Sequence, residues 1–364
     1  MKIAIIGANG FIGSRLIEVF HLGGQHEVVA IVRQPCSLAL PARFALDWRL
    51  GDALDAASLA NALKGCDAVV HAAIGDPRQI ERMPAILCAA ATIAGVNRVV
   101  YLSSASVHGQ NITPGTTEAT PLKANFPIEY NNAKVRAENS FFAAIRKHRL
   151  SGYALRPGVV YGPRSRWIAD LVNELRTGQA WLYEDGSGIC NSIYVDNLIH
   201  AVSCCLTATQ GAGEAYLVGD AETVTWANFY DLAADDVGVP HDHIHALSQL
   251  PEFKKTFREK VENAVAQPWM QALLPAVPFK LKQSSKRILA SWNLPPSPEA
   301  WALPGTPRPH ITQEVALLQQ NRWRFPHTKA SQALGFAPPV TFAEGMRRSL
   351  SWLRFATLDP TRQP

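Results

Sequence analysis

The first 160 residues alternate between short apolar runs and longer stretches in which polar and apolar positions recur at helical spacing. The apolar runs predict buried strands at 2–6, 27–33, 67–73, 98–104 and 152–157. The stretches between them predict helices at 11–22, 55–64, 79–95 and 128–148. Apolar strands separated by helices are typical of a parallel sheet covered on both faces, so the pattern predicts an α/β fold.

The pattern loosens after Pro157. Residues 162–190 suggest loop and helix, while 192–206 returns to a strand followed by a helix that rejoins the core. Residues 240–325 carry many proline and tryptophan residues without clean alternation, and we interpret them as a cap or insertion. Hydrophobic residues make up 47% and charged residues 18%, which is the composition of a globular protein.

The charge and the cysteines exclude several classes of protein. A net charge of +5 over 364 residues is too mild to indicate a nucleic-acid partner. None of the six cysteines stands in C-x-x-C spacing, so we expect no metal site, no disulfide framework and a reducing, cytoplasmic location. The longest apolar run after the first strand, 84–96, is too short to span a bilayer.

A glycine-rich turn follows the first predicted strand. "GANGFIG" spaces its glycines as G-x-x-G-x-x-G, which permits a tight turn, close approach of a pyrophosphate and close packing of strand and helix. The N-terminus of the next helix adds free N–H groups and a positive dipole end. The turn therefore predicts a dinucleotide site, whose contacts are Gly7, Asn9, Gly10, Phe11, Ile12 and Gly13.

The second predicted strand ends in "AIVRQP" without the carboxylate that usually holds a ribose 2′-hydroxyl. A guanidinium at Arg33 can instead pair with a 2′-phosphate. This favours NADP(H) as the cofactor, and NAD(H) remains the alternative if Arg33 stacks on the adenine.

Several ordered motifs together resemble the extended short-chain dehydrogenases/reductases, the NAD-dependent epimerase/dehydratase-like superfamily. They are "GANGFIG" (7–13), "GDALDAASL" (51–59), "DAVVHAA" (67–73), "YLSSASVHG" (101–109), "YNNAK" (130–134), "LRPGVVYGP" (155–163), "IYVDNLIHA" (193–201) and "TKASQALGFAPPVTFAEGMRRSLSWL" (328–353). The resemblance implies a Rossmann-type doubly wound parallel sheet in a core of residues 1–163. Residues 164–364 would then form a smaller, mixed substrate-binding region.

The resemblance also implies a role for each matching residue. Asp52 would contact the adenine, Ala72 and Ala73 would line the nicotinamide ribose, and Pro157 would pass near the nicotinamide. Ser104, Tyr130 and Lys134 would be the catalytic residues, with Lys134 also holding the ribose.

The chemistry of these three side chains supports that implication. Oxidising a carbinol removes a hydroxyl proton while hydride leaves, yet a free tyrosine has a pKa of about 10. Lowering it by roughly three units takes about 4 kcal/mol, which a neighbouring ammonium and a cationic nicotinamide can supply. A spacing of four places Tyr130 and Lys134 on one face of a helix. Ser104 can orient the reacting oxygen.

Other polar residues near these motifs receive structural interpretations. We expect Glu129, Arg136 and Glu138 on the solvated face of the helix, and Asp196 as the cap of a helix that begins at about 197. His108 stands where the family often has a tyrosine, and we expect it to pack or to donate a hydrogen bond on the substrate side.

Departures from the family pattern narrow the reaction. The Asp-Glu pair of the dehydratases is replaced by Ala105 and Ser106, which disfavours dehydration. The Asn and Arg with which epimerases hold a substrate diphosphate are replaced by Val159 and Cys190, although Arg164 and Arg166 lie nearby in sequence. We therefore predict redox of a secondary alcohol and ketone. The alternatives are epimerisation of a sugar nucleotide or lipid-linked sugar, and an inactive NADP-binding sensor or scaffold.

Two further expectations concern partners. Residues 252–287 hold eight basic and three acidic residues, so an interfacial membrane helix is a hypothesis beside the simpler one of a solvated cap. Family members often pair through helices equivalent to 79–95 and 128–148, which favours a homodimer. The substrate itself is expected to be a small molecule.

Overall fold

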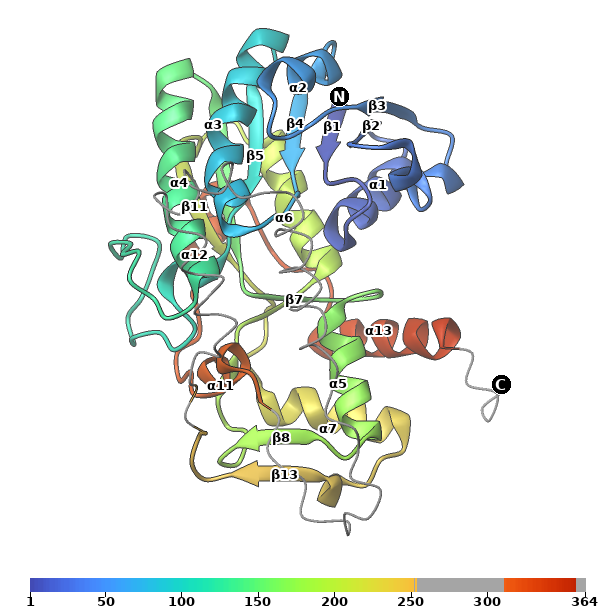
Figure 1. Ribbon diagram of the computed structural model, residues 1–364, viewed down its shortest axis with the longest axis vertical. Helices are drawn as coiled ribbons and strands as arrows, with labels where there is room; N and C mark the ends of the chain where they lie inside the picture. Colours follow the sequence, from blue (N-terminus) through green and yellow to red (C-terminus); the bar gives the residue numbers. More distant parts are fainter. Residues whose placement is uncertain (252, 254–310, 358–364) are drawn as a thin grey trace, which may run out of the picture.

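The computed structural model describes residues 1–251, 253 and 311–357 (Figure 1). Its core is a seven-stranded sheet in the order β11-β6-β5-β4-β1-β2-β3, in which every neighbouring pair is parallel. The strands are β1 (Lys2–Ile6), β2 (Glu27–Val32), β3 (Asp47–Leu50), β4 (Ala68–His71), β5 (Arg98–Leu102), β6 (Ser151–Pro157) and β11 (Glu214–Val218). The expected doubly wound parallel α/β fold is confirmed.

The two faces of the sheet carry separate apolar cores. In β1, Ile3 and Ile5 face the core that includes α1 and α6, whereas Ala4 and Ile6 face the one that includes α2, α3 and α4. Successive side chains of a strand point to opposite faces, so a strand buried on both faces is apolar throughout. These helices are α1 (Phe11–Gly23), α2 (Ala56–Leu63), α3 (Pro77–Ala94), α4 (Glu129–His148) and α6 (Val195–Thr207).

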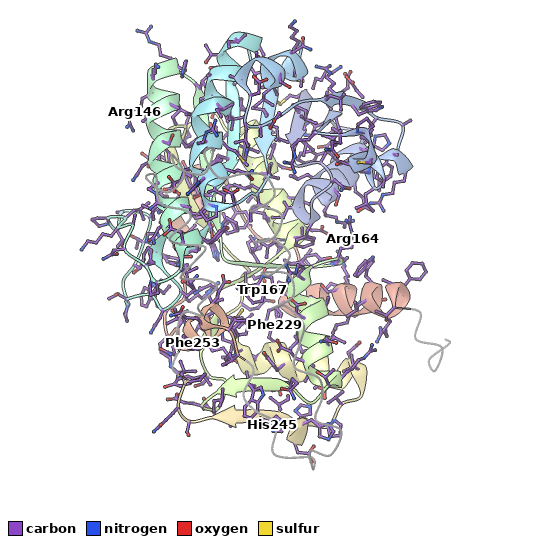
Figure 2. The ribbon with its side chains drawn as sticks, viewed as in Figure 1. Arg146, Arg164, Trp167, Phe229, His245 and Phe253 are labelled. Carbon is purple, nitrogen blue, oxygen red and sulfur yellow. The ribbon has the colours of Figure 1, made fainter. Side chains whose placement is uncertain are left out.

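A smaller lobe extends from the carboxyl ends of the strands (Figure 1). It contains β7 (Val159–Tyr161), α5 (Arg166–Arg176), β8 (Ala180–Tyr183), β9 (Ile189–Cys190), β10 (Ser192–Tyr194), β12 (Val224–Thr225), α7 (Trp226–Val237), β13 (Ile244–Leu247), α11 (Gln313–Gln319) and α13 (Phe342–Ala356). The helix α12 (Thr328–Leu334) lies instead beside β11 of the main sheet. Short 3-10 helices are η1 (Pro35–Leu38), η2 (Pro41–Arg43), η3 (Ala105–His108) and η4 (His241–His243). Aromatic residues link the elements of this lobe: Trp226 of α7 contacts Trp167 of α5, and Phe229 of α7 contacts Phe342 of α13. Trp167 and Phe229 are labelled in Figure 2.

The structure adds strands that the pattern did not predict, among them both edge strands of the main sheet, β3 and β11. β3 was missed because it is a four-residue edge strand in which only Arg49 is partly buried and the other three residues are exposed. Residues 162–190 contain the short strands β8 and β9 beside the expected helix. Most of the predicted cap at 240–325 lies outside the described residues, as does the basic stretch 252–287 apart from Phe253. The division of the chain at residue 163 stays a prediction.

Candidate active site

Two glycines fix the turn between β1 and α1. Gly7 has a φ of +86°, and a Cβ there would lie 2.7 Å from the backbone nitrogen of Ala73. A Cβ on Gly13 would lie 2.1 Å from the Gly7 carbonyl oxygen. Both positions therefore require glycine, and the turn is pressed against Ala72 and Ala73, the two residues that follow β4.

The start of α1 is open to a ligand. Gly10 is the N-cap, and no side chain of the described residues caps this end of the helix. Asn9 and Gly10 are exposed, while Phe11 and Ile12 are half-buried. The first-turn N–H groups and the positive helix end can therefore receive a phosphate, which makes the turn a fit for a dinucleotide pyrophosphate.

Two other predicted cofactor contacts lie at the same edge of the sheet. Arg33 directly follows β2, and its side chain is exposed. Asp52 lies two residues after β3, and one of its carboxylate oxygens accepts a hydrogen bond from the Leu54 nitrogen at 2.9 Å. The carboxyl ends of parallel strands share one edge, so both residues lie on the side of the glycine turn. Pro157, the last residue of β6, is buried at that edge.

Ser104 and Tyr130 meet beyond the end of β5. Ser104 is the N-cap of η3, and its hydroxyl accepts from the Ser106 nitrogen at 3.1 Å. Tyr130 lies in the first turn of α4, half-buried, and is hydrogen-bonded to the Ser104 side chain. Burial raises the pKa of the Tyr130 phenol to about 12, the Ser104 hydrogen bond acts to lower it, and the charge of Glu314 raises it further.

Lys134 lies one helical turn after Tyr130 and is buried. Its Nζ donates to the carbonyl oxygens of Leu102 at 3.0 Å and Ser103 at 3.5 Å, and lies 5.8 Å from the centroid of the Tyr130 ring. Burial lowers the pKa of Lys134 to about 8, while the carboxylate of Glu138 acts to raise it. The structure thus brings Ser104, Tyr130 and Lys134 together. Their catalytic roles remain predictions.

Glu138 corrects one expectation. It does not lie on the solvated face of α4 but is 1% exposed, in an ion pair with Arg156 of β6, which is 4% exposed. Glu129 and Arg136 do lie on the solvated face of that helix, and they pair with each other. Burial of Glu138 is compatible with its charge because Arg156 and the Ser103 hydroxyl both donate to it.

The structure also corrects the expectation that Asp196 caps a helix. The helix α6 begins at Val195 with Tyr194 as its N-cap and no side-chain cap from the described residues. The Asp196 carboxylate instead accepts two hydrogen bonds from Arg15, at 2.7 and 2.8 Å, and thereby ties α6 to α1. The residue is structural, as expected, but it links two helices rather than capping one.

His108 is occupied by packing and by a hydrogen bond inside the protein. Its ring lies 5.7 Å from that of Phe325, and its Nε2 accepts from Nη1 of Arg156 at 3.0 Å. Burial and the charge of Arg156 lower the pKa of His108 to about 4, so the imidazole is neutral at pH 7.

Arg164 and Arg166, the two arginines considered near the substrate-binding positions, have different surroundings in the structure. Nη1 of Arg164 donates to the Ser14 hydroxyl of α1 at 2.8 Å, below that helix in Figure 2. Its backbone has a φ of +73°, uncommon for a residue with a side chain. Arg166 is 92% exposed and lies 3.9 Å from Asp170. Arg164 is therefore near the cofactor turn, and Arg166 faces solvent.

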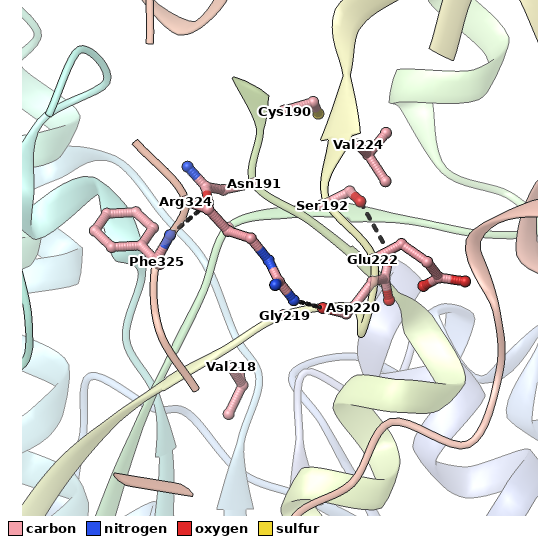
Figure 3. A pocket seen from close by; sticks show the side chains of 11 residues that line it. Cys190, Asn191, Ser192, Val218, Gly219, Asp220, Glu222, Val224, Arg324 and Phe325 are labelled. Atoms are coloured by element: carbon pink, nitrogen blue, oxygen red, sulfur yellow. Dashed lines mark hydrogen bonds between the residues drawn. The ribbon is translucent and has the colours of Figure 1, made fainter. Parts of the chain in front are cut away.

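A small cavity is lined by residues of β9, β10, β11 and β12 and by Arg324 and Phe325 of the segment that follows α11 (Figure 3). Arg324 donates to the carbonyl oxygens of Asp220 and Ala221, and the buried Asp220 carboxylate accepts from Ser192 at 2.9 Å. The cavity measures ≈ 10 Å³, room for about one water molecule. It lies where the lobe joins the sheet.

Sequence reasoning missed Glu314 of α11. Its carboxyl is hydrogen-bonded to the side chain of Gln110, and its charge acts on Tyr130. Gln110 in turn exchanges two hydrogen bonds with Asn131 of α4, at 3.0 and 2.5 Å. The residue lies in a region without a clear pattern, so no sequence signal pointed to it.

Comparison with known proteins adds the following. A sequence model described as the NAD dependent epimerase/dehydratase family matches residues 3–219, more than half of the chain. The 3beta-hydroxysteroid-dehydrogenase/decarboxylase isoform 2 of Arabidopsis thaliana is 26% identical over 326 residues, which cover 82% of this chain and 50% of that protein. The chain thus spans about half the length of this relative.

Two more comparisons cover nearly whole chains. The decarboxylating sterol-4-alpha-carboxylate 3-dehydrogenase of Dictyostelium discoideum is 23% identical over 365 residues, covering 95% of this chain and 98% of that protein. A dTDP-glucose 4,6-dehydratase from Streptomyces venezuelae, solved with NAD bound, matches with a TM-score of 0.70, 21% identity and complete coverage of both chains. The latter shows a shared fold.

None of the helices in the described ranges is both long and apolar enough to cross a membrane.

Proposed function

The chain belongs to the NAD dependent epimerase/dehydratase family, and on that premise we propose that it is an NAD(P)-dependent oxidoreductase that interconverts a secondary alcohol and a ketone. The observation that carries the proposal is the meeting of Ser104, Tyr130 and Lys134 at the edge of the sheet where the glycine turn lies. A site that combines an acid–base group, an orienting hydroxyl and a cation beside a dinucleotide turn suits hydride transfer.

The bound nicotinamide supplies the hydride donor or acceptor, and the side chains manage the proton. Tyr130 donates its phenolic proton to the oxygen of a ketone, or accepts the proton of an alcohol. Ser104 holds the same oxygen by a hydrogen bond. Lys134 would donate to the ribose hydroxyls of the bound cofactor, and its ammonium places a positive charge near the phenol.

The titration of Tyr130 favours a protonated phenol at neutral pH. Its pKa of about 12 makes it a ready donor for ketone reduction. In the oxidative direction the phenol must ionise, and a shift from 12 to 7 corresponds to about 7 kcal/mol. The Lys134 ammonium is the buried cation 5.8 Å from the Tyr130 ring, so keeping it charged is a requirement of the oxidative reaction.

The substrate is proposed to be a carbinol or ketone without a nucleotide handle. Val159 and Cys190, at the positions of the diphosphate-binding Asn and Arg, are both buried and offer no charge. Ala105 and Ser106 provide no carboxylates for a dehydration. The similarity to a 3beta-hydroxysteroid dehydrogenase and a sterol-carboxylate 3-dehydrogenase, whose names describe carbinol oxidation, supports this choice.

For the cofactor we propose NADP(H). The exposed guanidinium of Arg33 follows β2, and no carboxylate stands in "AIVRQP" to repel a 2′-phosphate. The similar dehydratase structure holds NAD, so NAD(H) is the alternative to be tested.

The test combines a cofactor titration with a substrate screen. NADPH and NADH binding are measured by nicotinamide fluorescence, and turnover is screened with 3-hydroxysteroids, 3-oxo acids and UDP-glucose. We expect oxidation or reduction of a carbinol or ketone that Tyr130→Phe abolishes while cofactor binding persists.

Other outcomes would select the alternatives. Interconversion of UDP-glucose without net redox would indicate a sugar epimerase. Cofactor binding without turnover of any class, unchanged by Tyr130→Phe, would indicate a sensor or scaffold.

A further inference from the structure

A buried carboxylate lies two helical turns after Tyr130 and one turn after Lys134. We propose that Glu138, fixed by Arg156, is a positioning residue that keeps Lys134 charged and aimed at the cofactor ribose, an inference that rests on the proposed function. Nε of Arg156 donates to the two carboxylate oxygens of Glu138 at 3.2 and 3.1 Å, and Nη2 donates as well.

The carboxylate also holds the strand end that binds Lys134. The Ser103 hydroxyl donates to Oε2 of Glu138 at 2.6 Å. The carbonyl oxygens of Ser103 and of Leu102 are the acceptors for the Lys134 Nζ. Fixing Ser103 therefore fixes the acceptors that orient the ammonium, and Glu138 reaches Lys134 through the backbone of β5.

The electrostatic argument is independent of these hydrogen bonds. A buried ammonium loses its hydration, which favours the neutral amine unless an opposite charge is near. The titratable or charged groups that face Lys134 are His71 of β4, Tyr101 of β5, and Tyr130 and Glu138 of α4. Arg156 of β6 contacts Glu138, and His108 of η3 contacts Arg156. Among these described groups Glu138 is the carboxylate, and its charge favours the ammonium form.

A chain of contacts connects the Glu138–Arg156 ion pair to the smaller lobe. Nη1 of Arg156 donates to His108 at 3.0 Å, and the His108 ring packs against Phe325. The backbone nitrogen of Phe325 donates to the side-chain oxygen of Asn191, which lies between β9 and β10 of the lobe, at 2.8 Å. Glu138 thus stands between the catalytic lysine and the joint of the two parts of the molecule.

The experiment measures cofactor affinity against pH, with NADPH and NADH as probes, and needs no substrate. In the unaltered protein the affinity should fall as Lys134 loses its proton near pH 8. In Glu138→Gln, which keeps the shape and removes the charge, the midpoint should move down by about one pH unit or more. With a midpoint one unit lower, the protonated fraction of Lys134 at pH 7.5 falls from about three quarters to about one quarter, so affinity at that pH should fall by about threefold.

Glu129→Gln is the matched control. It removes a carboxylate from the same helix at a 58% exposed position, and should leave both affinity and midpoint unchanged. A Glu138→Gln protein with the native circular dichroism and an unmoved midpoint would show that Glu138 only supports the fold, which overturns the proposal.

Ser103→Ala keeps the test decisive if Glu138→Gln does not fold. It leaves the ion pair intact but releases the strand end, so affinity should fall several-fold at every pH with the midpoint in place. Unchanged affinity would overturn the positioning role. Absence of NADPH and NADH binding by the unaltered protein would instead refute the proposed function, so the two failures are distinguishable.

Discussion

Replacing Gly13 with alanine tests the fit of the cofactor turn. The added Cβ would lie 2.1 Å from the Gly7 carbonyl oxygen and 2.8 Å from its carbon, and both atoms are backbone atoms that cannot rotate away. Ordinary contact begins at 3.4 Å, so α1 and the turn would have to separate by 3.4 − 2.1, which is 1.3 Å. Such overpacking costs about 1–3 kcal/mol of folding free energy.

The same displacement removes the N–H groups from hydrogen-bonding range of a phosphate. One charge-assisted hydrogen bond contributes about 1.5–3 kcal/mol, so the affinity for NADPH or NADH should fall by about 10- to 100-fold. The measurements are urea unfolding followed by circular dichroism, and fluorescence titration with both cofactors.

Gly23→Ala is the control, because Gly23 is an exposed residue at the other end of the same helix and its Cβ would meet nothing within 4 Å. Alanine there should leave affinity unchanged and raise stability by up to about 1 kcal/mol. If Gly13→Ala bound cofactor within twofold of Gly23→Ala, the assignment of this turn to the pyrophosphate would be refuted.

Three further predictions address the cofactor, the chemistry and the pH dependence. Arg33→Ala should weaken NADPH binding by about tenfold and leave NADH binding nearly unchanged; equal affinities in the unaltered protein would remove the 2′-phosphate argument. Tyr130→Phe should lower turnover of an identified substrate by about 10²–10⁴-fold with the urea midpoint preserved, and undiminished turnover would refute the acid–base role. Burial lowers the pKa of His71 to about 3, so the folded protein binds fewer protons than the unfolded chain. Stability should then be full above about pH 6.5 and fall towards pH 3 by up to about 5 kcal/mol, and His71→Leu should flatten this fall in urea titrations compared between pH 7 and 4.

The five inner strands of the main sheet were predictable from sequence, and its two edge strands, β3 and β11, were not. β1 and β4 are apolar in every position but one because both of their faces are covered. Such a continuous apolar run is easily distinguished from the flanking segments of the sequence. β3 consists of Asp47, Trp48, Arg49 and Leu50, three of them exposed, and only its pairing with β2 makes it a strand. The contacts that define it are long-range, so local pattern carries no trace of them.

Asp196 shows the same limit at a helix end. "YVDN" offers an acidic residue near a helix start, which is typical of a cap. The helix begins one residue before Asp196, and the side chain turns to Arg15, 181 positions away in the sequence. Glu314 likewise acts on Tyr130 across a separation of more than 180 residues. Neither contact can be predicted from the pattern of neighbouring residues in the sequence.

The burial of Glu138, by contrast, could have been predicted from its position around the helix α4. At 100° per residue, Lys134 lies 40° and Glu138 80° around the helix from Tyr130, within one buried stripe of about 100°. Glu129 and Arg136 fall on the opposite side, at about −100° and −120°, and both are exposed in the structure. The argument that joined Tyr130 to Lys134 therefore also placed Glu138 beside them, and only the general preference of carboxylates for water pointed the other way. The helical spacing could not predict Arg156, whose guanidinium on the neighbouring strand β6 pairs with the buried Glu138 carboxylate and compensates for its lost hydration.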